Sequence, residues 1–109
     1  MATTYKVLGQ VAPSATTLTT LYTVPASTQA VVSTISVCNQ SATATTFRIA
    51  IRVAGAGISG EDYIAYDSTI SGNDTTFITV GITLAATDVI SVYSTAATVS
   101  FNAFGSEIS

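Results

Sequence analysis

The chain has 109 residues, a formal net charge of −3 and a charged fraction of 8%, whereas a soluble domain usually carries about a quarter of charged residues. Three cations cannot neutralise many phosphates, and no apolar run approaches the ~20 residues of a membrane-spanning helix, so we expect neither nucleic-acid binding nor membrane insertion. With no His and a single Cys, the chain lacks the commonest general base and metal ligand, which predicts a protein that is not an enzyme and binds no cofactor or metal.

Short segments rich in Val, Ile, Thr, Tyr and Phe recur along the chain, separated by Pro, Gly, Asn, Asp, Ser or Ala-Thr clusters. This pattern predicts an all-β fold: one domain over residues 1–109, a single antiparallel β-sandwich of about eight strands, either jelly-roll or immunoglobulin-like. The expected strands are, in chain order, 5–11, 17–24, 29–38, 46–53, 63–70, 76–83, 89–94 and 98–104.

Three of these strands carry apolar residues on one face and mostly polar ones on the other. In the strand 46–53, the face expected to be buried holds Phe47, Ile49, Ile51 and Val53, and the opposite face holds Thr46, Arg48, Ala50 and Arg52. The strand 29–38 is expected to turn Val31, Ile35 and Val37 inward, although Val32 blurs its alternation, and the last strand Val99, Phe101 and Ala103. The C-terminal segment is therefore expected to close the core.

The connections contain residues that interrupt strands. Pro13 and Pro25 follow the first two strands, 55–60 is expected to be a flexible Gly-rich loop, and 71–74 a tight turn. The segment 84–88 is short enough for one helical turn. With no long helix expected, two sheets must bury each other.

Most chemistry-bearing side chains have an ordinary structural interpretation. Cys38 has no cation beside it in the sequence and is expected to be a buried structural thiol. The carboxylates match no calcium-loop spacing and are expected to be solvated in turns. Tyr63 and Tyr66 serve either as core aromatics with a wet hydroxyl or as a carbohydrate platform, and both interpretations stay open.

Arg48 and Arg52 lie four residues apart and share one strand face. Their guanidinium groups could bind carboxylates of another subunit, or pair with an acid of the same chain. The polar N-terminal segment, with Thr3, Thr4 and Tyr5, could add to the sheet edge of a neighbour by main-chain pairing. These five residues are the candidates for a subunit interface.

Several segments together carry a family resemblance: YKVLGQ at 5–10, LYTVP at 21–25, AVVSTISVCN at 30–39, TFRIAI at 46–51, ND at 73–74, GITL at 81–84, DVISVYS at 88–94 and VSFNAFG at 99–105. The chain resembles the small structural proteins and fibre modules of tailed bacteriophages, particularly marine and cyanobacterial ones. The resemblance covers nearly the whole chain and consists of strand and turn signatures.

The resemblance implies a virion structural protein without enzymatic activity. The expected role is a capsid decoration (cement) protein that binds and stabilises the assembled head; the alternative is a tail, neck or fibre component that binds a host surface or carbohydrate. The expected partners are the major capsid protein or other virion proteins, together with copies of the chain itself in a trimer or dimer. Because the N-terminus shows no secretory signal pattern, we expect assembly in the host cytoplasm and a final location in the virion.

Overall fold

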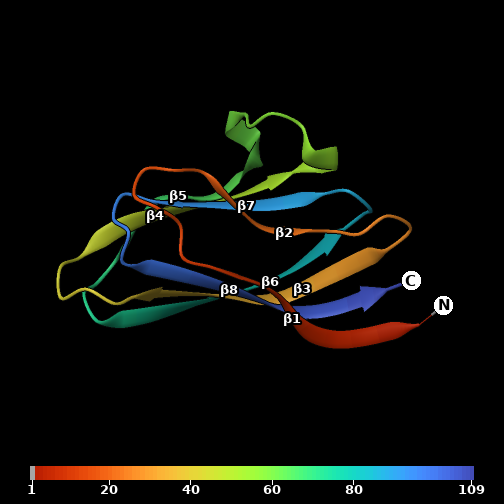
Figure 1. The fold of residues 1–109 in the computed structure, drawn as a ribbon, viewed down its shortest axis with the longest axis horizontal. Coiled ribbons are helices and arrows are strands. Elements are labelled where there is room, and N and C mark those ends of the chain that lie inside the picture. The colour runs from red at the N-terminus through yellow and green to blue at the C-terminus, as the bar shows by residue number, and fades with distance from the viewer. Residues whose placement is uncertain (1) are drawn as a thin grey trace.

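A computed structural model describes residues 2–109, apart from the side chain of Val80. Within this range two antiparallel sheets pack face to face (Figure 1). The strands are β1 (Thr3–Val11), β2 (Thr19–Thr23), β3 (Gln29–Asn39), β4 (Thr45–Arg52), β5 (Tyr63–Ile70), β6 (Asp74–Leu84), β7 (Val89–Ser94) and β8 (Val99–Ile108). Two short 3-10 turns, η1 (Val53–Gly55) and η2 (Gly60–Asp62), connect β4 to β5. No helix in the described part of the chain could cross a membrane.

The strand order shows which sandwich this is. Sheet A has the order β1-β8-β3-β6 and sheet B the order β2-β7-β4-β5. The first strand pairs with the last, the second with the seventh, the third with the sixth and the fourth with the fifth. The chain is thus one long hairpin rolled up on itself, which is the jelly-roll arrangement. The expected antiparallel β-sandwich is confirmed, and of the two connectivities considered, the jelly roll is the one present.

The strand bounds follow the turn residues closely. β5 and β7 begin and end where the sequence predicts, and the other strands differ by a few residues at their ends. The largest difference is at the C-terminus, where β8 continues to Ile108 instead of ending at residue 104. The reason is its place between β1 and β3, where it is paired on both edges through Ile108.

The core lies between the sheets and is built from side chains of both. Phe101 and Phe47 meet edge to face, with ring centroids 6.2 Å apart. The core side chains with no measurable exposure are Val32, Ile35, Val37, Ile49, Ile90, Val92, Val99, Phe101 and Ala103. The inward positions expected for β8 are confirmed, so the C-terminal strand does close the core.

The predicted facing of single residues is wrong in two strands, each time for a local reason. Val53 is 67% exposed, because β4 ends at Arg52 and the chain turns into η1 there. In β3, Val32 points inward with no exposure and Val31 points outward. The register shifts at Ser33, between Val32 and Thr34, and such a bulge reverses the alternation on one side of it.

Gly105 permits the close pairing of β8 with β3. A Cβ atom at this position would lie 1.9 Å from the carbonyl oxygen of Val31, a distance that no side chain tolerates. Glycine is otherwise unfavourable inside a strand, since it has no side chain to pack. Close backbone approach therefore explains why glycine occurs here.

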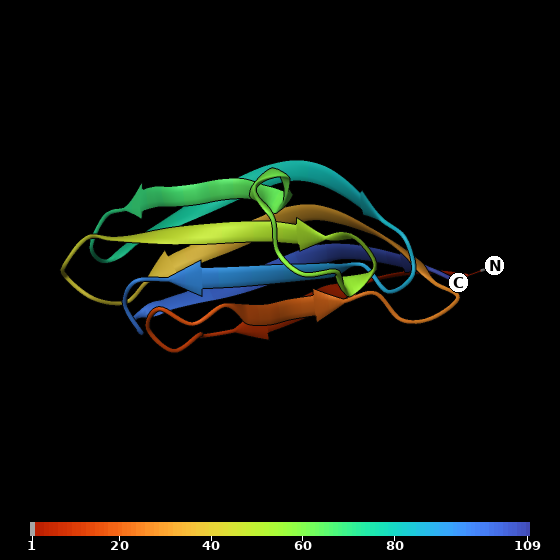
Figure 2. The same ribbon diagram turned by 90° about the horizontal axis from the view of Figure 1, so that it is seen from above.

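The segment 53–62, which connects β4 to β5, is called the cover segment below. It stands over the outer face of sheet B (Figures 1 and 2). The carboxylate of Asp88 accepts hydrogen bonds from the backbone N–H groups of Ala54 over 2.8 Å and Ala85 over 2.9 Å, which ties the cover to the β6–β7 connection. That connection is a turn rather than the helical turn considered from the sequence. This contact lies at Ala54, just before the Gly-rich loop 55–60, whose flexibility stays a prediction.

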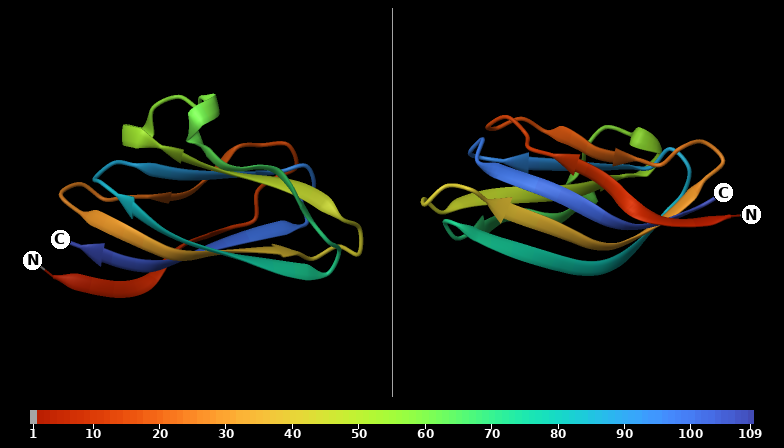
Figure 3. Two further views of the ribbon diagram at one scale, coloured as in Figure 1. Left: turned by 180° about the vertical axis from the view of Figure 1, so that it is seen from behind. Right: turned by 60° about the horizontal axis from the view of Figure 1, so that its bottom comes forward.

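Asn39 links the loops at the end of the sandwich that is remote from the two chain ends. The loops after β3, β5 and β7 gather there, away from the two chain ends (Figure 3). The side-chain amide nitrogen of Asn39 donates to the carbonyl oxygens of Thr43 over 2.9 Å and Ser71 over 3.3 Å. Its oxygen accepts from the N–H of Ser41 over 3.1 Å and from the hydroxyl of Thr98 over 3.0 Å. One side chain thus links three connections.

Candidate interaction face

The outer face of sheet A is uncharged. Strand register and the inward positions of the core decide which residues face outward. Among the described residues, this face consists of Thr3, Tyr5, Val7 and Gln10 on β1, Ser100, Asn102, Phe104, Ser106 and Ile108 on β8, Gln29, Val31, Thr34, Ser36 and Cys38 on β3, and Thr75, Phe77, Thr79 and Thr83 on β6. A sheet face without charge has little protection against association, which marks it as a contact surface.

Large apolar side chains stand at both edges of this face. On β1, Tyr5 is 84% exposed and Val7 47% exposed, and Val7 is paired directly with Phe104 of β8. On β6, at the far edge, Phe77 is 68% exposed. Between them lie small polar residues such as Ser36. Exposed aromatic rings of this size are the residues that most often anchor protein contacts.

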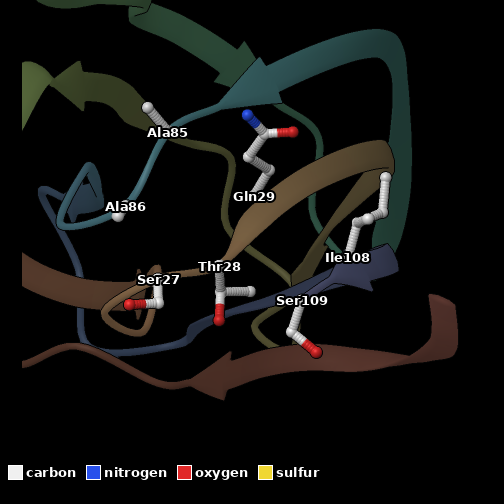
Figure 4. Close-up of a pocket in the computed structure, with 7 residues that line it drawn as sticks. All are labelled: Ser27, Thr28, Gln29, Ala85, Ala86, Ile108 and Ser109. Carbon is white, nitrogen blue, oxygen red and sulfur yellow. The ribbon is translucent and has the colours of Figure 1, made fainter. Parts of the chain in front are cut away.

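Hollows accompany these projecting side chains. One, of about 350 Å³, is lined by Gln10, Val11, Ala12, Ser100, Phe101 and Asn102. A second, of about 320 Å³, is lined by Gln29, Ala30, Val31, Thr83, Leu84, Ala85 and Ile108. A third, of about 470 Å³, adjoins the second at the end of the sandwich near the C-terminus (Figure 4), and is lined by Ser27, Thr28, Gln29, Ala85, Ala86, Ile108 and Ser109. None of these lining side chains is acidic or basic, so the hollows offer shape rather than charge.

Arg48 is held within its own chain on the outer face of sheet B. Its Nε lies 2.7 Å from Oδ1 of Asp67, and its Nη2 lies 3.3 Å from Oδ2. The guanidinium carbon lies 4.2 Å from the ring centre of Tyr66 and 4.4 Å from that of Tyr93, which are cation–π distances. The hydrogen bond to Asp67 is the main reason why the pKa of Arg48 lies above its ordinary value. The same-chain alternative thus describes Arg48.

Arg52 shapes the cover segment. Its Nε donates to the carbonyl oxygen of Ala56 over 2.7 Å and its Nη2 to that of Gly55 over 2.8 Å. Its Nη1 reaches the hydroxyl of Ser91 at 3.5 Å. The predicted pair of guanidinium groups is therefore engaged in intrachain contacts at both positions. A role for either residue between subunits stays a prediction.

Thr3, Thr4 and Tyr5 lie in β1, an edge strand. They pair with Ile108, Glu107 and Ser106 of β8 on one side. The main chain of this segment is therefore already half paired, and only its outer edge is free for a neighbour. Of the five predicted interface residues, Thr3 and Tyr5 also lie on the uncharged face of sheet A, and Tyr5 is the large side chain that projects from it.

The structure excludes the core interpretation of the two tyrosines and contradicts the expectations for Cys38 and Asp88. Tyr66 is 57% exposed and packs against Tyr63 at a centroid distance of 4.8 Å, so neither ring belongs to the core between the sheets. Cys38 is half-buried on the outer face of sheet A rather than in the core. Asp88 is buried and binds two backbone N–H groups, whereas a solvated carboxylate was expected.

A cluster of one tyrosine and one ion pair joins the two sheets at the end near the termini. The hydroxyl of Tyr22 in β2 donates to Oε2 of Glu107 in β8 over 2.5 Å, and Nζ of Lys6 lies 3.0 Å from Oε1. The hydrogen bond from Tyr22, followed by that from Lys6, lowers the pKa of the Glu107 carboxyl below its ordinary value. Burial, together with the neighbouring carboxylate, raises the pKa of the Tyr22 hydroxyl. The sequence offers no signal for this contact between residues 85 positions apart.

The class of fold follows from the strand order of the chain itself. The strand order defines a jelly-roll β-sandwich, an architecture found in virus capsid and lectin domains among others, and fold alone does not assign function. No protein-family model, curated protein sequence or solved structure matches the chain. Within residues 2–109, no group of three or more acidic or cysteine side chains gathers where it could hold a metal ion.

Proposed function

We propose that this chain is a non-enzymatic structural protein of a bacteriophage virion, and that it acts as a capsid decoration protein which binds the assembled head and stabilises it. The observation that carries the proposal is the uncharged outer face of sheet A, with Tyr5 and Phe77 projecting from it, which suits contact with copies of the chain itself and leaves the outer face of sheet B and the edge of β1 for the shell. The resemblance of the strand and turn segments to phage structural proteins gives the kind of particle. The partners are the major capsid protein, or other virion proteins, and copies of the chain itself.

Stabilisation would follow from selective binding to the assembled shell. A subunit that binds the assembled lattice, and not its dissociated parts, shifts the equilibrium toward assembly by mass action. Single contacts of a small sandwich are individually weak, but many copies on one shell act together through high effective concentration. The free edge of β1 at Thr3 to Tyr5 offers unpaired main-chain groups for such a contact.

A tail, neck or fibre component is the second candidate, and a specific cluster favours it. The exposed ring of Tyr66 lies next to the Arg48–Asp67 pair on the outer face of sheet B. An aromatic face beside hydrogen-bonding groups is the kind of surface that binds a sugar ring of a host glycan. In this role the protein would be present in few copies.

Copy number per particle separates these roles. Particles of the phage that encodes the chain would be purified, and the chain quantified by mass spectrometry against the major capsid protein. We expect hundreds of copies, as a decorated shell requires. A few to a few tens of copies would favour the tail, neck or fibre, and complete absence from particles would overturn the proposal of a virion protein.

A further inference from the structure

The projections and hollows of the uncharged face occupy opposite diagonals. Strand register places Phe77 of β6 level with Ser36, Asn102 and Gln10, toward one end of the face. The hollow lined by Gln10, Ser100 and Asn102 lies at this same level, on the other side of the sheet. The two features thus face each other across the width of sheet A.

The second projection repeats the arrangement in reverse. Tyr5 of β1 is level with Ser106, Val31 and Thr83, toward the other end of the face. The hollow lined by Val31, Thr83 and Ile108 lies at that level, again on the opposite side of the sheet. Each projecting ring therefore has a hollow directly across from it.

We propose that the outer face of sheet A binds the same face of a second copy of this chain about a twofold axis lying in the plane between the two faces. An axis along the strands exchanges β1 with β6 and brings Phe77 over the Gln10–Asn102 hollow and Tyr5 over the Val31–Thr83 hollow. An axis across the strands, through the middle level, exchanges the two ends and again brings each ring over a hollow. A twofold interface requires such a self-complementary surface.

The absence of charge also favours a second copy of the chain as the partner of this face. Two identical faces that meet would bring like charges together if the face carried any, and none of its described residues does. Arg48, Arg52 and Asp67 all lie with sheet B or its cover segment. Face-to-face contact through sheet A therefore avoids like-charge repulsion, although the chain as a whole has a net charge of −3.

The size of the face predicts a weak dimer. Four strands about 4.8 Å apart, each about ten residues long at roughly 3.3 Å per residue, give roughly 600 Å² per copy. Two copies together would bury roughly 1,200 Å², which is at the lower limit of specific interfaces. Two packed sheets with strands aligned to within about 30° are a common arrangement inside proteins, and the dimer would reproduce it between molecules.

This inference rests on the homo-oligomer in the proposed function and not on its phage assignment, so it is tested with the purified chain alone. Sedimentation velocity would be measured over two decades of concentration for the native chain and for Phe77→Asp, Asn102→Arg and Val53→Asp. The first two variants alter a projection and a hollow. Val53 is also exposed, but it lies on the cover segment of sheet B and serves as the matched control. Thermal melting at low concentration checks that each variant is folded.

We expect a concentration-dependent dimer of the native chain and of Val53→Asp, and a dissociation constant raised at least about tenfold in both sheet A variants. A native chain that stays monomeric throughout, a trimer, or equal weakening by Val53→Asp would overturn the proposal. The proposal would also be overturned if the native chain is monomeric and Phe77→Asp abolishes its binding to particles. In that case the outer face of sheet A binds the shell and not a second copy. The copy number of the native chain per particle is measured separately. Failure of the dimer and failure of the proposed virion function can therefore be distinguished.

Discussion

Asn39 is the polar side chain on which one end of the sandwich depends. It is 1% exposed, and its amide group is fully used by Ser41, Thr43, Ser71 and Thr98. Removal of such a group leaves buried main-chain groups without partners, which costs more than the loss of the hydrogen bonds themselves.

We expect Asn39→Ala to lower the free energy of unfolding by about 3 kcal/mol. The matched control is Asn102→Ala, which removes a half-buried amide from the outer face of sheet A and should cost less than about 0.5 kcal/mol. Urea titration monitored by circular dichroism measures both. Equal losses for the two variants would show that the Asn39 network contributes nothing beyond an ordinary surface amide.

The contact between Tyr22 and Glu107 predicts a pH-dependent stability. The folded state lowers the pKa of Glu107 below its ordinary 4.5, so the stabilisation is present above that pH and is lost as the pH falls through the folded value. The folded state raises the pKa of Tyr22 above its ordinary 10.0, so stability also falls as the pH rises beyond 10.0. Between these limits the charge-assisted hydrogen bond is intact.

Tyr22→Phe removes the hydroxyl and keeps the ring in the core. At pH 7 we expect it to lower the free energy of unfolding by about 1 to 2 kcal/mol, as for other hydrogen bonds to a charged group. The difference from the native chain should shrink on acidification below pH 4.5. Chemical unfolding at a series of pH values measures it, and a difference that stays constant down to acid pH would contradict the assignment.

At the scale of the elements, a glycine fixes how closely β8 pairs with β3. Gly105→Ala would push a Cβ atom against the carbonyl oxygen of Val31, and we expect a loss of about 3 kcal/mol or failure to fold. Gly57→Ala is the matched control, because no atom lies within 4 Å of its added Cβ and the variant should be neutral. Thermal melting compares them. A Gly105→Ala variant as stable as Gly57→Ala would mean that the strands can separate without cost.

Strand limits could be predicted from the sequence, whereas strand facing could not always be. β7 begins after Asp88, and β5 ends before the Ser71-Gly72 turn, both clear local signals. In β6, Phe77 is followed by Ile78, so both faces look apolar, and only pairing shows that Phe77 is exposed while Ile78 packs against the core. The main projection of the candidate face was missed for this reason.

The candidate interface from the sequence agrees only in part with the face that the structure presents. Thr3 and Tyr5 belong to both. Arg48 was a candidate because its partner was unknown, and Asp67, nineteen residues away, becomes that partner only when β5 pairs with β4. Such pairings depend on register, and a single bulge changes them.

At the scale of the whole molecule, the nested hairpin separates two kinds of surface. Sheet A presents an uncharged outer face, and sheet B carries the Arg48–Asp67 pair and the cover segment. This division makes the molecule two-sided, with one side suited to neutral contact and the other able to meet a polar partner. A decoration protein that also self-associates needs two such sides.

The sequence by itself determined the all-β class, the eight strands and most of their limits, because alternation and turn chemistry act between neighbours along the chain. Only the tertiary structure decided the jelly-roll order, the partners of Arg48, Asn39 and Glu107, and the placement of Tyr5 and Phe77 across from hollows. These features depend on pairing between residues far apart in the chain, which composition and local spacing do not specify.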